Sequence, residues 1–225
     1  MKKWTVQDVM TADVVTVQFQ TSYHDIVSLM AARNVSAVPV IDEMDRVLGV
    51  VSEADLLLKI EYGSEDAPRF FAWGTRRKEK VKAHGATAAE LMSTPPVTVL
   101  PNTSLTSAAK LLDREHIKRL PVVNELGRLV GIVSRSDLLS VYLRPDDTIR
   151  DDIAEDVLRR VLQLDVTDAH VEVVEGIATL TGEVDRKSTA QIAVHLTRAV
   201  PGVIDVVDQI SFAYDDTAVA ATTGL

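Results

Sequence analysis

Residue types that could bind a nucleotide occur in two short segments, Gly-Val-Val-Ser-Glu-Ala-Asp at 49–55 and Gly-Ile-Val-Ser-Arg-Ser-Asp at 131–137. In each segment a strand is predicted to end and a helix to begin at a serine, with an aspartate three residues later. The start of a helix offers free backbone N–H groups and a positive dipole end to an anion. A carboxylate one turn into the helix can accept hydrogen bonds from a sugar diol. The pattern therefore suits a nucleotide, with its phosphate at the helix start and its ribose on the aspartate.

The same serine and aspartate also have a purely structural interpretation. Ser52 with Asp55, and Ser134 with Asp137, fit a variant of the capping box, in which the two side chains satisfy backbone groups at the start of a helix. Taken alone, each segment favours capping, and the nucleotide interpretation stays open beside it.

The two segments belong to a longer repeat of about 50 residues, present twice at a constant offset of 82 residues and without a gap. Residues 10–57 and 92–139 share 17 identities in 48 positions, where ordinary composition gives roughly one in fifteen by chance. The copies therefore share a fold. Because two copies are too few for a solenoid, each should bury its apolar face against the other as a pseudo-two-fold pair.

Each copy predicts a strand, a helix, two strands and a second helix. The strands expected in the first copy are 14–17, 37–41 and 47–51, and the second helix is expected at 53–60. The first helix is expected to be capped by Thr21 or Ser22 and to carry Ile26, Leu29 and Met30 on one face. The corresponding ranges in the second copy are 97–99, 104–114, 120–123, 129–133 and 135–142. Strands without strict alternation suggest sheets covered by helices, so the expected fold class is α/β (α+β).

The rest of the chain divides into three further parts. Residues 61–86 between the copies form a linker that contains Phe70, Phe71 and Trp73, and its stretch 69–82 carries a net charge of +5. Its aromatic residues could pack on the repeats or across a dimer interface, or present a docking surface together with the basic residues. Residues 150–214 predict a separate α+β unit, and residues 215–225 predict a disordered tail.

The repeated order of elements, with a hydrophobic-Pro-Val strand and Gly-φ-φ-Ser-x-x-Asp-Leu-Leu in both copies, resembles the tandem CBS domain (cystathionine β-synthase motif), or Bateman module. The resemblance covers residues 5–143, with one CBS repeat at 5–60 and the other at 87–143. It implies a non-catalytic regulatory module that pairs its repeats and usually dimerises. It also implies an adenine nucleotide ligand such as AMP, ADP, ATP or S-adenosylmethionine, with no tightly bound cofactor.

The resemblance implies roles for individual residues. Asp55 and Asp137 would hold ribose hydroxyls, and Ser52 and Ser134 would contact phosphate or ribose. The residues that would border the adenine are Thr16, Thr98, Val14, Val15 and Val97. The residues that precede the central prolines, Pro39 and Pro121, would approach the phosphates; they are Ser36, Ala37, Val38, Lys118, Arg119 and Leu120.

Charge distinguishes the two copies. The second copy has Lys118, Arg119, Arg135 and Ser136, all suited to phosphate oxygens. The first copy has Ser36, Ala37, Glu53 and Ala54 at the same positions, and Glu53 would repel a phosphate. We therefore predict that the second site binds the nucleotide, while the first is empty or takes an uncharged adenosine-like group. Lys118 and Arg119 could equally lie on an ordinary solvated surface, because the pairing can place basic residues of one copy near the cleft of the other.

The pattern Val-Glu-Val-Val-Glu-Gly-Ile-Ala-Thr-Leu-Thr-Gly-Glu-Val at 171–184, followed by a helix and Pro-Gly-Val-Ile-Asp-Val-Val at 201–207, resembles a BON domain. That family is associated with phospholipid or envelope attachment and with osmotic stress. Residues 150–216 here contain 14 acidic and 6 basic residues, a net charge of −8, and anionic headgroups would repel them. A protein partner or another small ligand fits this unit better than a membrane.

Composition and missing motifs exclude several classes of protein. The absence of cysteine excludes disulfides and thiolate sites, and the five histidines show no metal-ligand spacing. Walker A, GxGxxG and GxSxG motifs are absent, so no enzymatic activity is expected. No run of 18 apolar residues occurs, which favours a cytoplasmic location. The net charge of −9 makes nucleic-acid binding improbable.

Two functions remain open. The first is an allosteric sensor in which a nucleotide changes the packing of the repeats or of a homodimer, and the C-terminal unit or another protein detects that change. The second is a ligand-independent dimeric scaffold that displays the acidic C-terminal unit and the linker to a protein or envelope partner.

Overall fold

The computed structural model describes residues 4–62, 86–164 and 169–217, which divide into two compact units. One unit is Thr5–Leu138 and holds the paired repeats. The other consists of residue 4 and the chain from residue 139 onward. The linker stretch 69–82, with Phe70, Phe71 and Trp73, lies outside the described residues.

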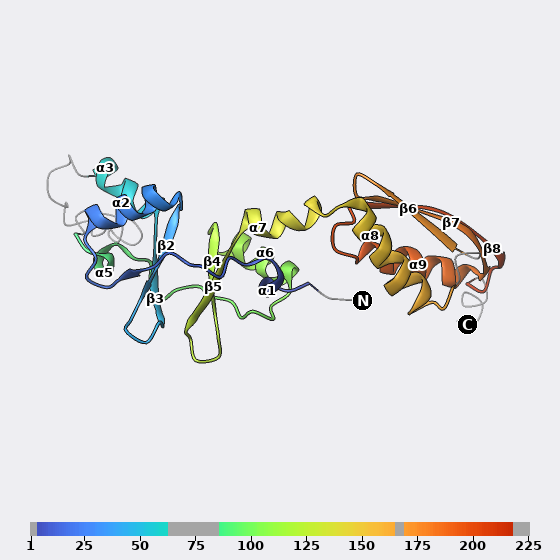
Figure 1. The fold of residues 1–225 in the computed structure, drawn as a ribbon, viewed down its shortest axis with the longest axis horizontal. Coiled ribbons are helices and arrows are strands. Elements are labelled where there is room, and N and C mark those ends of the chain that lie inside the picture. The colour runs from blue at the N-terminus through green and yellow to red at the C-terminus, as the bar shows by residue number, and fades with distance from the viewer. Residues whose placement is uncertain (1–3, 63–85, 165–168, 218–225) are drawn as a thin grey trace, which may run out of the picture. The chain divides into compact units, whose positions relative to one another are not determined.

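The first repeat has the predicted order of elements after an additional short helix, α1, and its first strand begins at Val17 instead of Val14 (Figure 1). Its elements are α1 Val6–Val9, β1 Val17–Gln18, α2 Tyr23–Arg33, β2 Ala37–Ile41, β3 Val47–Ser52 and α3 Glu53–Tyr62. Strand β1 pairs parallel to β2, and β2 pairs antiparallel to β3. Helix α2 begins after Ser22, whose hydroxyl accepts a hydrogen bond from the Asp25 amide, so the expected serine cap is present.

The second repeat has the same topology with a shorter first strand. Its elements are α5 Ala88–Leu91, α6 Leu105–Arg114, β4 Arg119–Val123, β5 Leu129–Ser134, α7 Arg135–Leu139 and the 3₁₀ turn η1 Ser140–Leu143. Strands β4 and β5 pair antiparallel in the same register as β2 and β3, with Pro121 opposite Ile132 as Pro39 is opposite Val50. The strand predicted at 97–99 is reduced to one parallel bridge between Val99 and Val122.

The repeats exchange their short N-terminal helices. Val6 of α1 is fully buried in the core of the second repeat, whereas Ala88 and Leu91 of α5 are fully buried in the core of the first. Backbone hydrogen bonds join the copies with the same symmetry, because Thr11 pairs with Ile132 and Ser93 pairs with Val50. Each repeat is therefore completed by a helix that belongs to the other.

The exchange explains two of the identities between the copies. A Cβ atom on Gly49 would lie 2.5 Å from the Met92 sulfur, and one on Gly131 would lie 2.6 Å from the Met10 sulfur. Since real Cβ atoms do not approach so closely, each glycine leaves room for the methionine of the opposite copy. The β2–β3 and β4–β5 hairpins also contact each other near their turns (Figure 1), where the backbones of Arg46 and Arg128 pair in an isolated antiparallel β-bridge.

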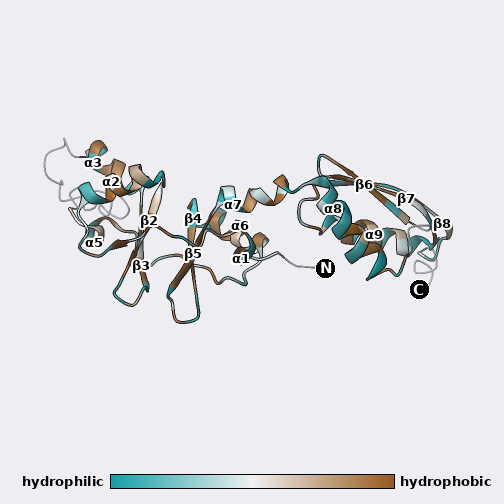
Figure 2. Cartoon of the chain, viewed as in Figure 1, coloured by the Kyte–Doolittle hydropathy of each residue, from teal (hydrophilic) through white to brown (hydrophobic). Residues whose placement is uncertain are grey.

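The C-terminal unit is an α+β fold, as predicted. Its elements are α8 Asp146–Asp152, the π-helical turn η2 Ile153–Arg159, β6 Ala169–Val174, β7 Ile177–Arg186, α9 Lys187–Arg198 and β8 Asp205–Tyr214. Strand β7 lies between β6, antiparallel to it, and β8, parallel to it. Helix α9 carries both hydrophilic and hydrophobic residues (Figure 2) and buries Ala190, Ala193 and Thr197. Among the described helices, none is long and apolar enough to cross a membrane.

The segment predicted as a disordered tail begins with residues that make defined contacts. Asp215 pairs with Lys187, and Asp216 accepts hydrogen bonds from the backbone and side chain of Ser188. Residues 218–225 lie outside the described ranges.

Candidate functional site

Two of the cavities between the repeats have corresponding linings. The first cavity has a volume of about 220 Å³. It is lined by Ser36, Ala37, Val50, Ser52, Glu53, Ala54, Asp55, Ser93, Pro95, Pro96, Val97, His116, Ile117, Lys118 and Arg119. The second cavity, of about 280 Å³, is lined by Thr11, Asp13, Val14, Val15, Val35, Ala37, Arg119, Ile132, Ser134, Ser136 and Asp137. Every residue of the second cavity has a counterpart 82 positions away in the first. The pseudo-two-fold symmetry thus extends from the fold to the cavities.

The aspartate of each motif accepts hydrogen bonds from the serine at the start of its helix, and in the second copy the Asp137 amide also donates to the Ser134 hydroxyl, which completes a capping box. One Asp55 carboxylate oxygen accepts hydrogen bonds from the Ser52 amide at 2.9 Å and the Ser52 hydroxyl at 2.7 Å. The corresponding bonds from Ser134 to Asp137 are both 2.7 Å. The structural interpretation of the motif is therefore correct in both copies. The two aspartates also line their cavities, so capping and ligand contact are compatible roles for the same side chains.

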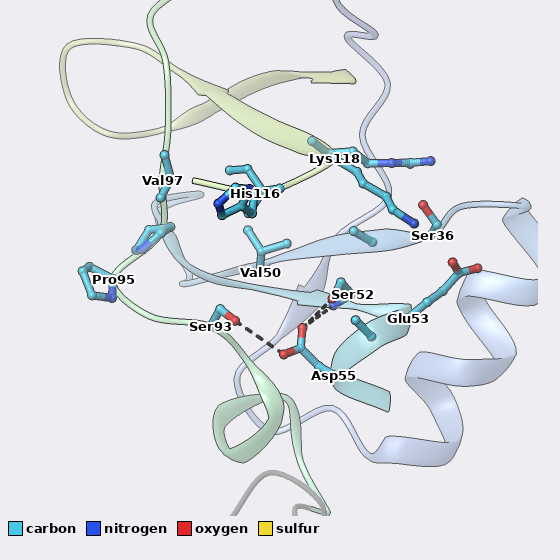
Figure 3. Close-up of a pocket in the computed structure, with 15 residues that line it drawn as sticks. Ser36, Val50, Ser52, Glu53, Asp55, Ser93, Pro95, Val97, His116 and Lys118 are labelled. Atoms are coloured by element: carbon cyan, nitrogen blue, oxygen red, sulfur yellow. Dashed lines mark hydrogen bonds between the residues drawn. The ribbon is translucent and has the colours of Figure 1, made fainter. Parts of the chain in front are cut away.

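Packing between the copies positions the Asp55 side chain. Only 9% of its surface is exposed, and its second carboxylate oxygen accepts a hydrogen bond from the Ser93 hydroxyl at 3.4 Å. Figure 3 shows the Asp55 carboxylate between Ser52 and Ser93 on one wall of the cavity. Because Ser93 follows Met92 in the exchanged segment, both repeats contribute to this wall.

The first cavity has chemically different ends. Pro95, Val97 and His116 lie together at one end, and Ser36, Glu53 and Lys118 lie at the other (Figure 3). Asp55 lies between them. The first end suits a flat base, the Asp55 carboxylate suits sugar hydroxyls, and the charged end suits a phosphate. This is the order of base, ribose and phosphate in a nucleotide.

The structure groups the predicted site residues differently from the sequence comparison. Lys118 was expected beside Ser134 and Asp137 of its own repeat, but it lines the first cavity with Ser52 and Asp55 and is absent from the lining of the second. Lys118 lies directly before β4, which begins at Arg119, and the pairing of the repeats brings this stretch to the motif of the other copy. Arg119 lines both cavities.

The other predicted residues divide into three groups. Val97 lines the first cavity, and Val15 and Ser136 line the second. Leu120 and Pro121 are buried in strand β4, and Leu120 belongs to the core of the second repeat. Thr16, Thr98 and Arg135 line neither cavity, and the Arg135 guanidinium donates a hydrogen bond to the Leu112 carbonyl at 3.3 Å.

The sequence prediction missed five residues of the first cavity: Ser93, Pro95, Pro96, His116 and Ile117. The first three follow the exchanged Met92, and only the pairing of the copies brings them to Ser52. His116 has φ +53°, as its counterpart Asn34 has φ +51°, so both leave their helices in the left-handed conformation. The position of His116 between the end of a helix and the start of a strand could have indicated a site residue. In the sequence the histidines were considered only as metal ligands, and His116 was therefore not selected. No group of three potential metal-binding side chains occurs among the described residues.

Family models confirm the predicted order of domains. A model described as CBS domain matches residues 6–62 and 88–144, and a model described as BON domain matches residues 145–214.

Individual relatives cover the CBS pair. The chloroplastic CBS domain-containing protein CBSX2 of Arabidopsis thaliana is 33% identical over a 153-residue alignment, and the match covers 63% of this chain and 64% of that protein. YhcV, a CBS domain-containing protein of Bacillus subtilis, is 32% identical over 134 residues, covering 60% of this chain and 82% of its own length.

A solved structure resembles the same region. The crystal structure of CBSX2 in complex with AMP has a TM-score of 0.56 and 32% identity, and the match covers 62% of this chain and 97% of that chain. Since the CBS model alone matches just over half of the 225 residues, the chain belongs to the CBS-domain family, with a pair of CBS domains followed by a BON domain.

Proposed function

We propose that the protein is a non-catalytic sensor that binds an adenine nucleotide in the first cavity. The observation that carries the proposal is that Ser52 and Asp55 from one repeat and Lys118 and Arg119 from the other line a single cavity. The carboxylate would accept hydrogen bonds from the ribose, and the two cations would pair with phosphate oxygens. The base would lie at the end formed by Pro95, Val97 and His116.

The resemblance to CBSX2, which was crystallised with AMP, supports this ligand class. AMP, ADP, ATP and S-adenosylmethionine are the candidates, since all four share the adenosine group. The sequence comparison alone favoured the second cavity for phosphate, but it relied on Lys118, which lines the first cavity. The first cavity is therefore our choice for the phosphate-bearing ligand.

A signal from this site requires a partner. Leu57 and Ile60 of α3 are 57% and 75% exposed, which supports a homodimer formed through the CBS pair. The C-terminal unit, with its net charge of −8 over residues 150–216, would then bind or release a protein partner according to the state of the CBS pair.

The alternative function is a scaffold that needs no ligand. It is favoured by the outer face of the C-terminal sheet, where Val174, Ile177 and Val207 are 59%, 41% and 40% exposed. Capture of a protein partner that is equal with and without nucleotide, and that is lost when these residues are changed to serine, would support it over the sensor.

Isothermal titration calorimetry of the full chain with AMP, ADP, ATP and S-adenosylmethionine tests the sensor. We expect binding by the wild type, loss of the first-cavity site in Asp55→Ala, weaker binding at that site in Lys118→Ala and no change in Asp113→Ala, which alters an exposed aspartate of α6. Lys118 is exposed and takes no part in the capping boxes, so its variant separates ligand contact from folding. If no ligand binds below about 1 mM, where binding is worth about 4 kcal/mol, the sensor is ruled out.

A further inference from the structure

The two cavities share one cation. Among the described residues, Ala37 and Arg119 are the pair that lines both cavities, and they occupy corresponding positions in the two repeats. The pseudo-two-fold symmetry therefore puts an arginine and an alanine at equivalent positions between the cavities. A symmetric module would have a cation at both of these positions, whereas this one has a single guanidinium, that of Arg119, because the equivalent residue is Ala37.

The second cavity depends on Arg119 for its positive charge more than the first cavity does. The first cavity also has Lys118, which offsets one of its two carboxylates, Glu53 and Asp55. The second cavity has the carboxylates Asp13 and Asp137, and Arg119 is the one cationic side chain that lines it in the described part of the chain. Without Arg119, the second cavity would present two carboxylates and no cation to an anionic ligand.

We propose that Arg119 couples the two cavities, so that a nucleotide phosphate in one of them weakens the binding of a second nucleotide in the other. A guanidinium forms its strongest contact with a phosphate through two parallel N–H···O bonds, which fix its plane and direction. Once it has turned toward a phosphate in the first cavity, a phosphate in the second would meet the carboxylates alone. The coupling is reciprocal, because it is a free energy shared by the two binding steps.

The inference rests on the proposed nucleotide binding and predicts how many nucleotides bind. The wild type should bind one AMP per chain tightly and the second at least about tenfold more weakly, within the usual range of coupling between sites. Adenosine has no phosphate to engage Arg119, so its two binding steps should be equal apart from the difference between the cavities themselves.

Calorimetry of AMP with the full-length chain and cavity-specific variants measures the coupling. Asp55→Ala disables the first cavity and leaves Arg119 to the second. This variant should bind one AMP about tenfold more tightly than the second binding step of the wild type. The double variant Asp55→Ala with Arg119→Ala should lose that binding, while Asp137→Ala should keep the tight first step. Lys118→Glu, which changes the first cavity without touching a capping box, repeats the measurement if Asp55→Ala does not fold.

The outcomes distinguish failure of the coupling from failure of the proposed function. The coupling would be overturned if the wild type binds two AMP molecules with affinities that Asp55→Ala leaves unchanged. It would also be overturned if neither Asp55→Ala nor Lys118→Glu binds AMP. In both cases, binding of AMP by the wild type would still support the sensor. No AMP bound by any protein, the wild type included, would overturn the proposed function and the coupling with it.

Discussion

At the scale of single residues, three pairs of corresponding positions distinguish the charges that the two repeats carry near the cavities. Ser36 and Ala37 of the first repeat stand where the second has Lys118 and Arg119, and Glu53 stands where it has Arg135. Either residue type is tolerated at these positions, because they lie outside the two hydrophobic cores of the repeats. Substitutions there change the ligand preference more than the stability.

Glu53 lies at the same end of the first cavity as Lys118 (Figure 3) and would oppose a phosphate bound there. We expect Glu53→Gln to tighten AMP binding about threefold to tenfold, since removal of one repulsive charge near the surface is worth about 1 kcal/mol. Calorimetry should show the gain for AMP and none for adenosine, which lacks the phosphate. Glu125→Gln, in the exposed turn between β4 and β5, is the matched control. An equal gain for adenosine would contradict the electrostatic explanation.

At the scale of elements, hydrogen bonds from side chains join segments that are distant in sequence. Helix α9 begins directly after β7, and its first residues contact the chain just beyond β8. The Lys187 ammonium lies 2.8 Å from the Asp215 carboxylate, and the Ser188 hydroxyl donates to Asp216 at 2.6 Å. These contacts connect the start of the helix to the end of the sheet.

The Asp215 carboxylate makes this connection sensitive to acid. Hydrogen bonds from Lys187 and then from Thr217 lower the pKa of Asp215 from 3.8 to about 2. Because its pKa is lower in the folded state, the carboxylate stabilises the fold above about pH 4 and loses this contribution as the pH falls toward 2.

The corresponding prediction concerns Asp215→Asn. The melting temperature of this variant should be lower than that of the wild type at pH 5, and the difference should shrink between pH 4 and pH 2, where the wild type loses the same charge. Thermal unfolding of the full chain, followed by circular dichroism, measures both values. Asp185→Asn, on the exposed side of β7, is the control. A difference that stays constant from pH 5 to pH 2 would contradict the role of the Asp215 charge.

At the scale of the whole molecule, the CBS pair is one folding unit made from two interleaved copies. The short helices α1 and α5 are each four residues long, too short to be stable alone in water. Each is held because its apolar side chains enter the core of the opposite repeat. Damage to a helix of one repeat should therefore be felt in the other.

Leu91→Ala tests this interleaving. Leu91 is fully buried in the core of the first repeat although it belongs to the second, so its truncation should cost about 2–5 kcal/mol. Hydrogen exchange should show a loss of protection in α2 and β2 of the first repeat. Leu100→Ala, at a position that is 42% exposed, should leave both repeats protected. Loss of protection confined to the second repeat would show that the copies fold independently.

The order of strands and helices could be predicted from the sequence because local patterns determine it. The offset of 82 residues, the apolar runs and the serine caps at Ser22 and Ser104 are all readable along the chain. The same is true of the Ser-x-x-Asp motifs, since a capping box involves residues three apart.

Only the tertiary structure decided which residues share a cavity. Lys118 and Asp55 are far apart in the sequence, and they line one cavity because the repeats pair around a pseudo-two-fold axis and exchange α1 and α5. The same pairing gives Arg119 access to both cavities. Local patterns thus predict the main strands and helices of each repeat and the residues of each motif. The assignment of charge to each cavity depended on contacts between the copies, which no local pattern encodes.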